Sequence, residues 1–129
     1  MLNQTGIKKT TYEGPTQILF NVQNQMSVGI LVDDAYSVTR DGRKIVPAGT
    51  PLSGDLTARN TAFVKATTTS SVSNATGILL HDVDVTNGDS NGTLLIWGFV
   101  DLNKIDTTTA ALITSEAKTA LSGKVTFLK

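Results

Sequence analysis

The sequence predicts a small, mainly β domain with one short helix near the C-terminus. Three observations support this fold class. Short apolar segments alternate with turn residues over most of the chain. Asp-Gly and Asn-Gly pairs, which favour tight hairpin turns, recur along it. Helical spacing of apolar side chains is found only over residues 107–123, and 129 residues suit a single domain.

The first 17 residues differ in character from the rest. They are polar, and Gly6, Gly14 and Pro15 interrupt any periodic pattern. Terminal segments of this kind are commonly disordered. We therefore expect a flexible, extended N-terminal arm over residues 1–17 and one β domain over residues 18–129.

In the first half of the domain, residues 18–22 and 28–32 are apolar and predict strands. The Asp-Gly pair within residues 40–43 predicts a hairpin turn. Pro47 and Pro51 exclude a helix or a central strand in their part of the chain. We therefore expect a tight turn at residues 47–49 and an edge-like segment at residues 50–52. Residues 67–76 are rich in serine and threonine and predict an exposed loop.

The second half has stronger patterns. Residues 77–85 predict a strand that ends with valines alternating with acids, and two Asn-Gly pairs in residues 87–92 predict a surface turn. Residues 93–100 are almost continuously apolar, which favours a strand covered on both faces. Residues 124–128 predict a final strand.

The predicted helix spans residues 107–123. Its apolar stripe consists of Leu112, Ile113, Ala117, Ala120 and Leu121, with Glu116 on the polar side. The candidate N-caps are Thr107, Thr108 and Thr109, and Gly123 takes the left-handed position after the helix.

Composition argues against several classes of function. Eleven basic and eleven acidic residues leave no net charge, whereas a general nucleic-acid binder needs excess positive charge. The absence of cysteine excludes disulfides, thiolate nucleophiles and cysteine-ligated zinc. The longest apolar run, residues 94–100, is too short to span a membrane, and no secretory signal is expected.

The residues that carry chemistry do not form a catalytic pattern. His81 is the only histidine, and its strand neighbour Asp82 should point to the opposite face. Neither Asp82 nor Asp84 is therefore placed as the acid of a triad, and no Gly-x-Ser-x-Gly sequence presents a nucleophile. We expect no enzymatic activity and no cofactor.

Residues 82–89 resemble the start of a calcium loop. The glycine comes one position late and the closing carboxylate is missing, so a polar hairpin is favoured over a weak Ca²⁺ site, which the sequence leaves open. Arg40, Arg43 and Lys44 surround the Asp-Gly turn, and we interpret them as a charged hairpin tip rather than an anion site.

Three segments together resemble the bacteriophage head decoration proteins, the small capsid-stabilising family that includes the lambda decoration protein. Residues 44–54 (KIVPAGTPLSG) are similar to that family's turn into an AGTPLG edge. Residues 77–85 (GILLHDVDV) are similar to its GIL-x-x-DVD strand, and residues 93–101 (TLLIWGFVD) to the strand that follows. The C-terminal helix and the Phe-Leu tail continue the same order, and the closest likeness is to decoration or head-fibre base proteins of tailed phages of Gram-positive hosts.

The resemblance implies a β-clip-like domain of irregular strands. It implies a homotrimer seated at three-fold sites on the outer surface of an expanded phage head, after assembly in the host cytoplasm, with the major capsid protein as partner. It also implies that the N-terminal arm pairs with the capsid protein's sheet. The arm residues carried over as capsid contacts are Ile7, Lys8, Lys9, Thr10, Thr11 and Tyr12.

Two other functions stay open at this point. A ligand-binding β-clip module of the SAF type uses a similar AGTxL turn, and an enzyme would have to rely on His81 with Asp82 or Asp84. A monomer in solution would favour the ligand-binding module. Loss of a function in His81→Ala, with fold and assembly intact, would favour the enzyme.

Overall fold

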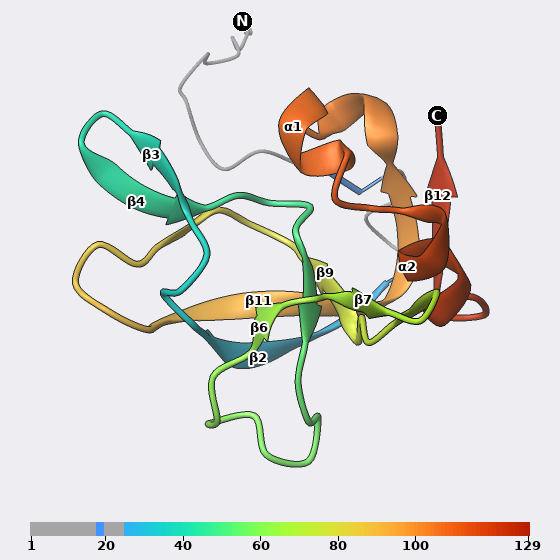
Figure 1. Ribbon diagram of the computed structural model, residues 1–129, viewed down its shortest axis with the longest axis horizontal. Helices are drawn as coiled ribbons and strands as arrows, with labels where there is room; N and C mark the ends of the chain where they lie inside the picture. The colour runs from blue at the N-terminus through green and yellow to red at the C-terminus, as the bar shows by residue number, and fades with distance from the viewer. Residues whose placement is uncertain (1–17, 20–24) are drawn as a thin grey trace, which may run out of the picture.

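The computed structural model describes residues 18–19 and 25–129 and has the predicted mainly β fold (Figure 1). Most strands are short, and the helices gather near the C-terminus. In chain order the elements are β2 (Met26–Val32), β3 (Val38–Arg40), β4 (Arg43–Val46), β5 (Pro51–Ser53), β6 (Val64–Lys65), β7 (Thr68–Thr69), β8 (Val72–Ser73), β9 (Gly77–Leu79), β10 (Val83–Asp84), β11 (Ser90–Asp101), the 3-10 helix η1 (Leu102–Lys104), α1 (Thr107–Ala110), α2 (Ser115–Ala120) and β12 (Val125–Leu128).

The longest strand, β11, organises the largest sheet because it has partners along both edges. Its first half pairs antiparallel with β2 and β9, so that Leu94 lies opposite Val28 and also opposite Leu79. Its second half pairs in parallel with β12, beginning with Gly98 opposite Val125. Beyond β9 the sheet continues through β5 to β6. The parallel partner is reached through the helices, as a parallel connection requires.

The prediction that residues 50–52 form an edge-like segment is wrong. Strand β5 lies between β9 and β6, with Pro51 opposite Ile78 and Leu52 opposite Lys65. A proline is tolerated here because it is the first residue of the strand, where a missing N–H does little harm. The turn before it is confirmed, with Gly49 at a left-handed φ of 97°.

Two hairpins project from this sheet. The predicted turn between β3 and β4 is confirmed, and Asp41 and Gly42 have φ values of 52° and 77°, as the favoured two-residue hairpin turn requires. The Ser/Thr-rich segment is mostly exposed, as expected, but it forms a small hairpin of β7 and β8. Its turn residues Ser70 and Ser71 also have left-handed φ values, 52° and 65°.

The strand predicted over residues 77–85 is divided between two sheets. β9 belongs to the large sheet, whereas β10 pairs with β4, with Val83 opposite Val46. β10 is therefore no hairpin partner of β11. The surface turn lies at residues 86–89, whereas residues 90–92, also predicted to be in the turn, belong to β11. The alternation is confirmed, because Val83 and Val85 are buried and Asp84 between them is partly exposed.

The single helix predicted over residues 107–123 is instead two short helices. Thr114 breaks it, because its backbone is extended (ψ 171°) and its hydroxyl accepts the N–H of Ala117 at 3.2 Å, which starts α2. The predicted threonine N-caps are also wrong. Residues 107–109 lie inside α1, and Asp106 occupies its N-cap position.

The apolar stripe nevertheless faces inward across both helices. Ile113, Ala117 and Leu121 are buried, while Leu112 and Ala120 are half-buried. Gly123 has the predicted left-handed conformation, with φ of 80°, but it lies beyond the end of α2 in the turn that leads to β12.

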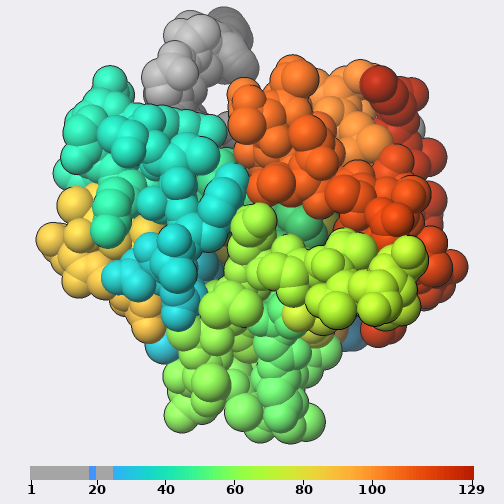
Figure 2. Space-filling view, in the orientation of Figure 1, coloured from blue at the N-terminus to red at the C-terminus, as the bar shows by residue number. Residues whose placement is uncertain are grey.

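Two hydrophobic clusters pack on opposite faces of β9 and β11. One contains Leu95 and Ile78 together with the buried residues of the helical region. The other contains Leu94 and Leu79 and is centred on the fully buried Phe63. Figure 2 shows the helical region and the β3–β4 hairpin at two corners of one face, with the loop between β5 and β6 projecting below. The surfaces described next belong to the elements that pack around these two clusters.

Candidate functional site

The predicted capsid contacts cannot be placed. Ile7, Lys8, Lys9, Thr10, Thr11 and Tyr12 all fall in residues 1–17, outside the described part of the chain. The described residues that the sequence singled out are His81, the acids that follow it, and the arginines of the β3–β4 hairpin.

The acids beside His81 are held by the hairpin, not by the histidine. The carboxylate of Asp82 accepts the N–H of Ala48 at 2.7 Å and forms an ion pair with Arg40 at 3.0 Å. Nδ1 of His81 is buried and has no hydrogen-bond partner among the described residues. His81 therefore lacks the orienting acid that a general base needs.

Asp84 forms the second clamp between β10 and the hairpin. Its carboxylate binds the guanidinium of Arg43 and accepts the N–H of Thr86 at 2.9 Å. Hydrogen bonds from the hydroxyl and N–H of Thr86, followed by that from Arg43, lower the pKa of Asp84 to about 2. Arg40 and Arg43 thus do more than charge the hairpin tip. Their ion pairs link the β3–β4 hairpin to Asp82 and to Asp84 of β10.

These ion pairs also argue against the calcium loop considered for residues 82–89. The carboxylates of its first two acids are occupied by arginine. Asp89 instead lies near Asp33 and Asp34, with carboxylate oxygens within 4.8 Å of one another. Asp89 accepts the N–H of Asp34 at 3.0 Å and Asp33 accepts that of Ala35 at 2.7 Å, which accounts for the grouping without an ion.

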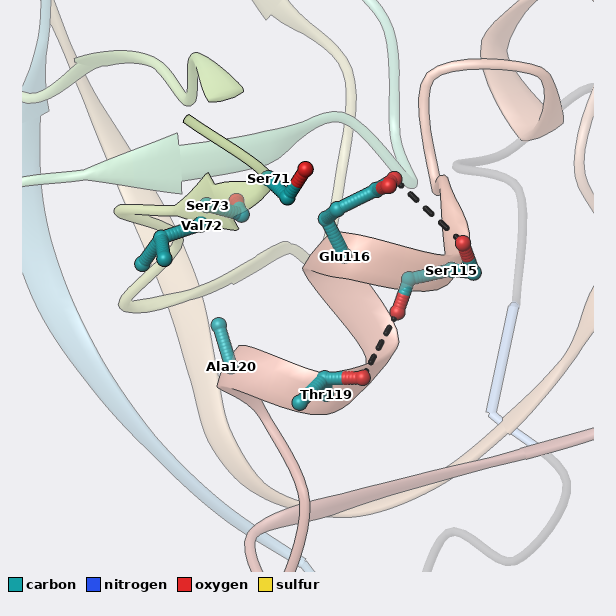
Figure 3. A pocket seen from close by; sticks show the side chains of 7 residues that line it. All are labelled: Ser71, Val72, Ser73, Ser115, Glu116, Thr119 and Ala120. Carbon is teal, nitrogen blue, oxygen red and sulfur yellow. Dashed lines mark hydrogen bonds between the residues drawn. The ribbon is translucent and has the colours of Figure 1, made fainter. Parts of the chain in front are cut away.

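A hollow of about 290 Å³ lies between the β7–β8 hairpin and α2, and four of the seven residues that line it carry a hydroxyl group (Figure 3). Ser115 Oγ lies 3.3 Å from a carboxylate oxygen of Glu116, and the hydroxyl of Thr119 donates to the carbonyl of Ser115 at 2.9 Å. No histidine or lysine lines this hollow to act as a base. Its polar groups can hydrogen-bond a partner, and Glu116 supplies the one carboxylate among the residues that line the hollow.

The most distinctive exposed surface of the described residues is apolar. Met26 and Trp97 are paired across β2 and β11, and the two residues are 59% and 46% exposed. The ring of Phe99 meets that of Trp97 edge-on, with centroids 6.1 Å apart. We call Met26 and Trp97 the Trp97 surface. The expectation that β11 is covered on both faces fails here, because the register shifts between Leu95 and Trp97.

Beside the Trp97 surface, alternate backbone groups of β2 point away from β11. Leu31 turns its N–H and C=O away from β11, toward the carbonyl of Arg59 (3.2 Å) and the N–H of Phe63 (2.7 Å). Because these groups alternate along an antiparallel strand, Ser27 turns its own N–H and C=O outward as well. No described residue bonds them.

Sequence reasoning missed both the Trp97 surface and the Asp33–Asp34–Asp89 group. The only signal for the acids was the Asp-Asp pair that follows β2, and nothing local connects it with Asp89. A search of known family models and a search of curated proteins found no match to this chain. Among the described helices, none has the length and apolar character needed to cross a bilayer.

Proposed function

We propose that this chain is a capsid decoration protein that binds as a homotrimer at three-fold sites on the expanded phage head and stabilises the shell. Its place would be the outer surface of the virion, reached from the host cytoplasm, and its partner the major capsid protein. No chemical transformation and no cofactor form part of this role.

The proposal is supported chiefly by where the three segments of the family resemblance lie. Residues 44–54 supply most of β4 and all of β5, residues 77–85 supply β9 and β10, and residues 93–101 supply most of β11. β4 pairs with β10, β5 with β9, and β9 with β11. Segments that are separate along the chain thus form one hydrogen-bonded unit, as motifs of a shared fold should.

A decoration protein stabilises its shell by mass action. It binds the assembled lattice and not the free subunits, so each bound copy shifts the equilibrium toward the intact shell. Trimeric binding multiplies this effect, because three linked contacts raise the effective concentration of each other. The arm adds main-chain hydrogen bonds by pairing with a strand of the capsid protein, and Lys8 and Lys9 suit an acidic rim, which mainly affects association rate and specificity.

The test is co-sedimentation with expanded phage capsids assembled from the major capsid protein without decoration protein. We expect the chain to sediment with capsids at micromolar concentration and light scattering to give the mass of a trimer. Absence from the capsid pellet would overturn the proposal. A monomer in solution would favour the SAF-like ligand-binding module instead.

A further inference from the structure

Two asparagines of the chain are followed directly by glycine, and the structure places them in different surroundings. Asn87 and Gly88 lie in the surface turn between β10 and β11, whereas Asn91 and Gly92 belong to β11 itself. We propose that Asn87 is a site of spontaneous deamidation in the folded protein and that the fold protects Asn91. This inference goes beyond the proposed function and does not depend on it.

Deamidation of this kind needs water but no enzyme. The backbone nitrogen of the following residue gives up its proton to water and attacks the side-chain carbonyl carbon of the asparagine. The new carbon–nitrogen bond closes a cyclic imide, and the side-chain amide nitrogen leaves as ammonia. Water then opens the imide at either of its carbonyls, which produces aspartate or its isoaspartyl isomer. A following glycine favours the closure because it has no side chain and its backbone is the least restricted.

The surroundings of Gly88 leave room for this closure. A Cβ at Gly88 would meet nothing within 4 Å, and its φ of 118° is one that glycine adopts freely. Its N–H donates to the carbonyl of Val85 at 3.1 Å, and its carbonyl accepts the hydroxyl of Ser90 at 3.1 Å. Both bonds lie in a surface turn, where local opening costs little free energy. Opening of the turn frees the nitrogen to attack the side chain of Asn87.

Gly92, in contrast, is fixed by pairing and by packing. The backbone groups of Leu31 point away from β11, so those of its neighbour Ile30 point toward β11 and form a hydrogen-bonded pair with Gly92. A Cβ at Gly92 would lie 2.8 Å from side-chain atoms of Val32 and of Val83, which are both buried. Attack by the nitrogen of Gly92 therefore requires β2 and β11 to separate, and paired strands open far more rarely than surface turns.

Access to water does not distinguish the two sites, because Asn87 and Asn91 are both exposed. The other asparagines of the chain precede residues other than glycine, whose side chains obstruct the closure. Deamidation at Asn87 gives a chain without net charge one negative charge. That charge lies two positions before Asp89, the acid that is grouped with Asp33 and Asp34.

Peptide mapping of the full folded chain tests the inference, because acidic residues separate the two sites. A protease that cuts before aspartate releases residues 84–88 and residues 89–100 as different peptides. After incubation in mildly alkaline buffer, we expect conversion to aspartyl and isoaspartyl products to be about tenfold faster at Asn87 than at Asn91. In concentrated urea the two rates should become similar, because the unfolded chain protects neither site.

Equal rates at the two sites in the folded protein, or a faster rate at Asn91, would overturn the inference. A preference for Asn87 that persists unchanged in urea would do the same, because the sequence and not the fold would then be its cause.

Isoelectric focusing of matched variants gives an independent reading. The acidic band that forms on incubation should disappear in Asn87→Gln, because glutamine closes a larger ring far more slowly, and should persist in Asn91→Gln. The opposite pattern contradicts the inference. Both residues are exposed, so neither replacement disturbs the core. Capsid co-sedimentation is measured separately, so each proposal can fail without the other.

Discussion

Leu94 and Leu95 are consecutive residues of β11, both fully buried, yet they belong to different hydrophobic clusters on opposite faces of the sheet. The neighbouring strand β9 repeats the arrangement with Ile78 and Leu79. One pair of adjacent strands therefore supplies the inner wall of both cores. The helical region and the Phe63 side of the domain are joined through these few side chains.

Truncation of either leucine should destabilise the whole domain. We expect Leu94→Ala and Leu95→Ala each to lower the free energy of unfolding by about 2–5 kcal/mol, because each leaves a cavity in a closed core. Urea unfolding followed by circular dichroism measures this, with the exposed Asn91→Ala as control. Two separate transitions in either variant would show that the clusters unfold independently.

Gly77 and Gly29 form a matched pair of glycines in β9 and β2, the two strands that flank β11. A Cβ at Gly77 would lie 2.5 Å from the backbone oxygen of Leu95, whereas one at Gly29 meets nothing within 4 Å. We expect Gly77→Ala to cost about 1–3 kcal/mol or more and Gly29→Ala to stay within about 0.5 kcal/mol of the parent. Equal melting temperatures for the two variants would contradict the packing described here.

Local signals were enough to predict much of this fold. The turn at Asp41 and Gly42 is predicted by those two residues alone. The alternation of Val83 and Val85 with acidic residues predicts that both valines are buried. The break in the helix also had a local signal that the apolar stripe concealed: Thr114 is followed by Ser115 and Glu116, a sequence typical of a helix start.

What could not be predicted depends on contacts between distant residues. β10 pairs with β4, and Arg40 and Arg43 form ion pairs with acids about forty positions away; no local pattern encodes these contacts. The exposure of Trp97 arises from a register shift inside an apolar run, where hydrophobicity predicts burial for every residue. The candidate surface therefore became visible only in three dimensions.

The clamp at Asp84 should make stability sensitive to acid. Its pKa is lowered from 3.8 to about 2 in the folded protein, so the folded state binds the proton less readily than the unfolded state. The stabilisation is complete above about pH 4 and is lost as the pH falls toward 2. We expect the melting temperature of the parent to fall faster over this range than that of Asp84→Asn, measured by thermal melts across pH.

The control for the Asp84 experiment is Asp41→Asn, because Asp41 is exposed at the hairpin turn and asparagine tolerates its left-handed backbone. This variant should keep the acid sensitivity of the parent. Parallel loss of stability in the parent and in Asp84→Asn between pH 4 and pH 2 would show that the clamp does not contribute.

Deletion of residues 1–17 tests the role of the arm at the shell and leaves the buried residues at the start of the described chain in place. Ile18 and Leu19 are 0% and 2% exposed, and both remain when residues 1–17 are deleted. We expect the shortened chain to keep its circular dichroism spectrum and trimeric mass but to lose co-sedimentation with undecorated capsids, because strand addition to the capsid protein supplies the binding bonds. Exchanging Lys8 and Lys9 for serine in the full chain should instead slow association and weaken its dependence on salt. Equal capsid binding by the full and shortened chains would exclude the arm as the contact and would direct attention to the Trp97 surface, where Trp97→Ser could then be tested in the same assay.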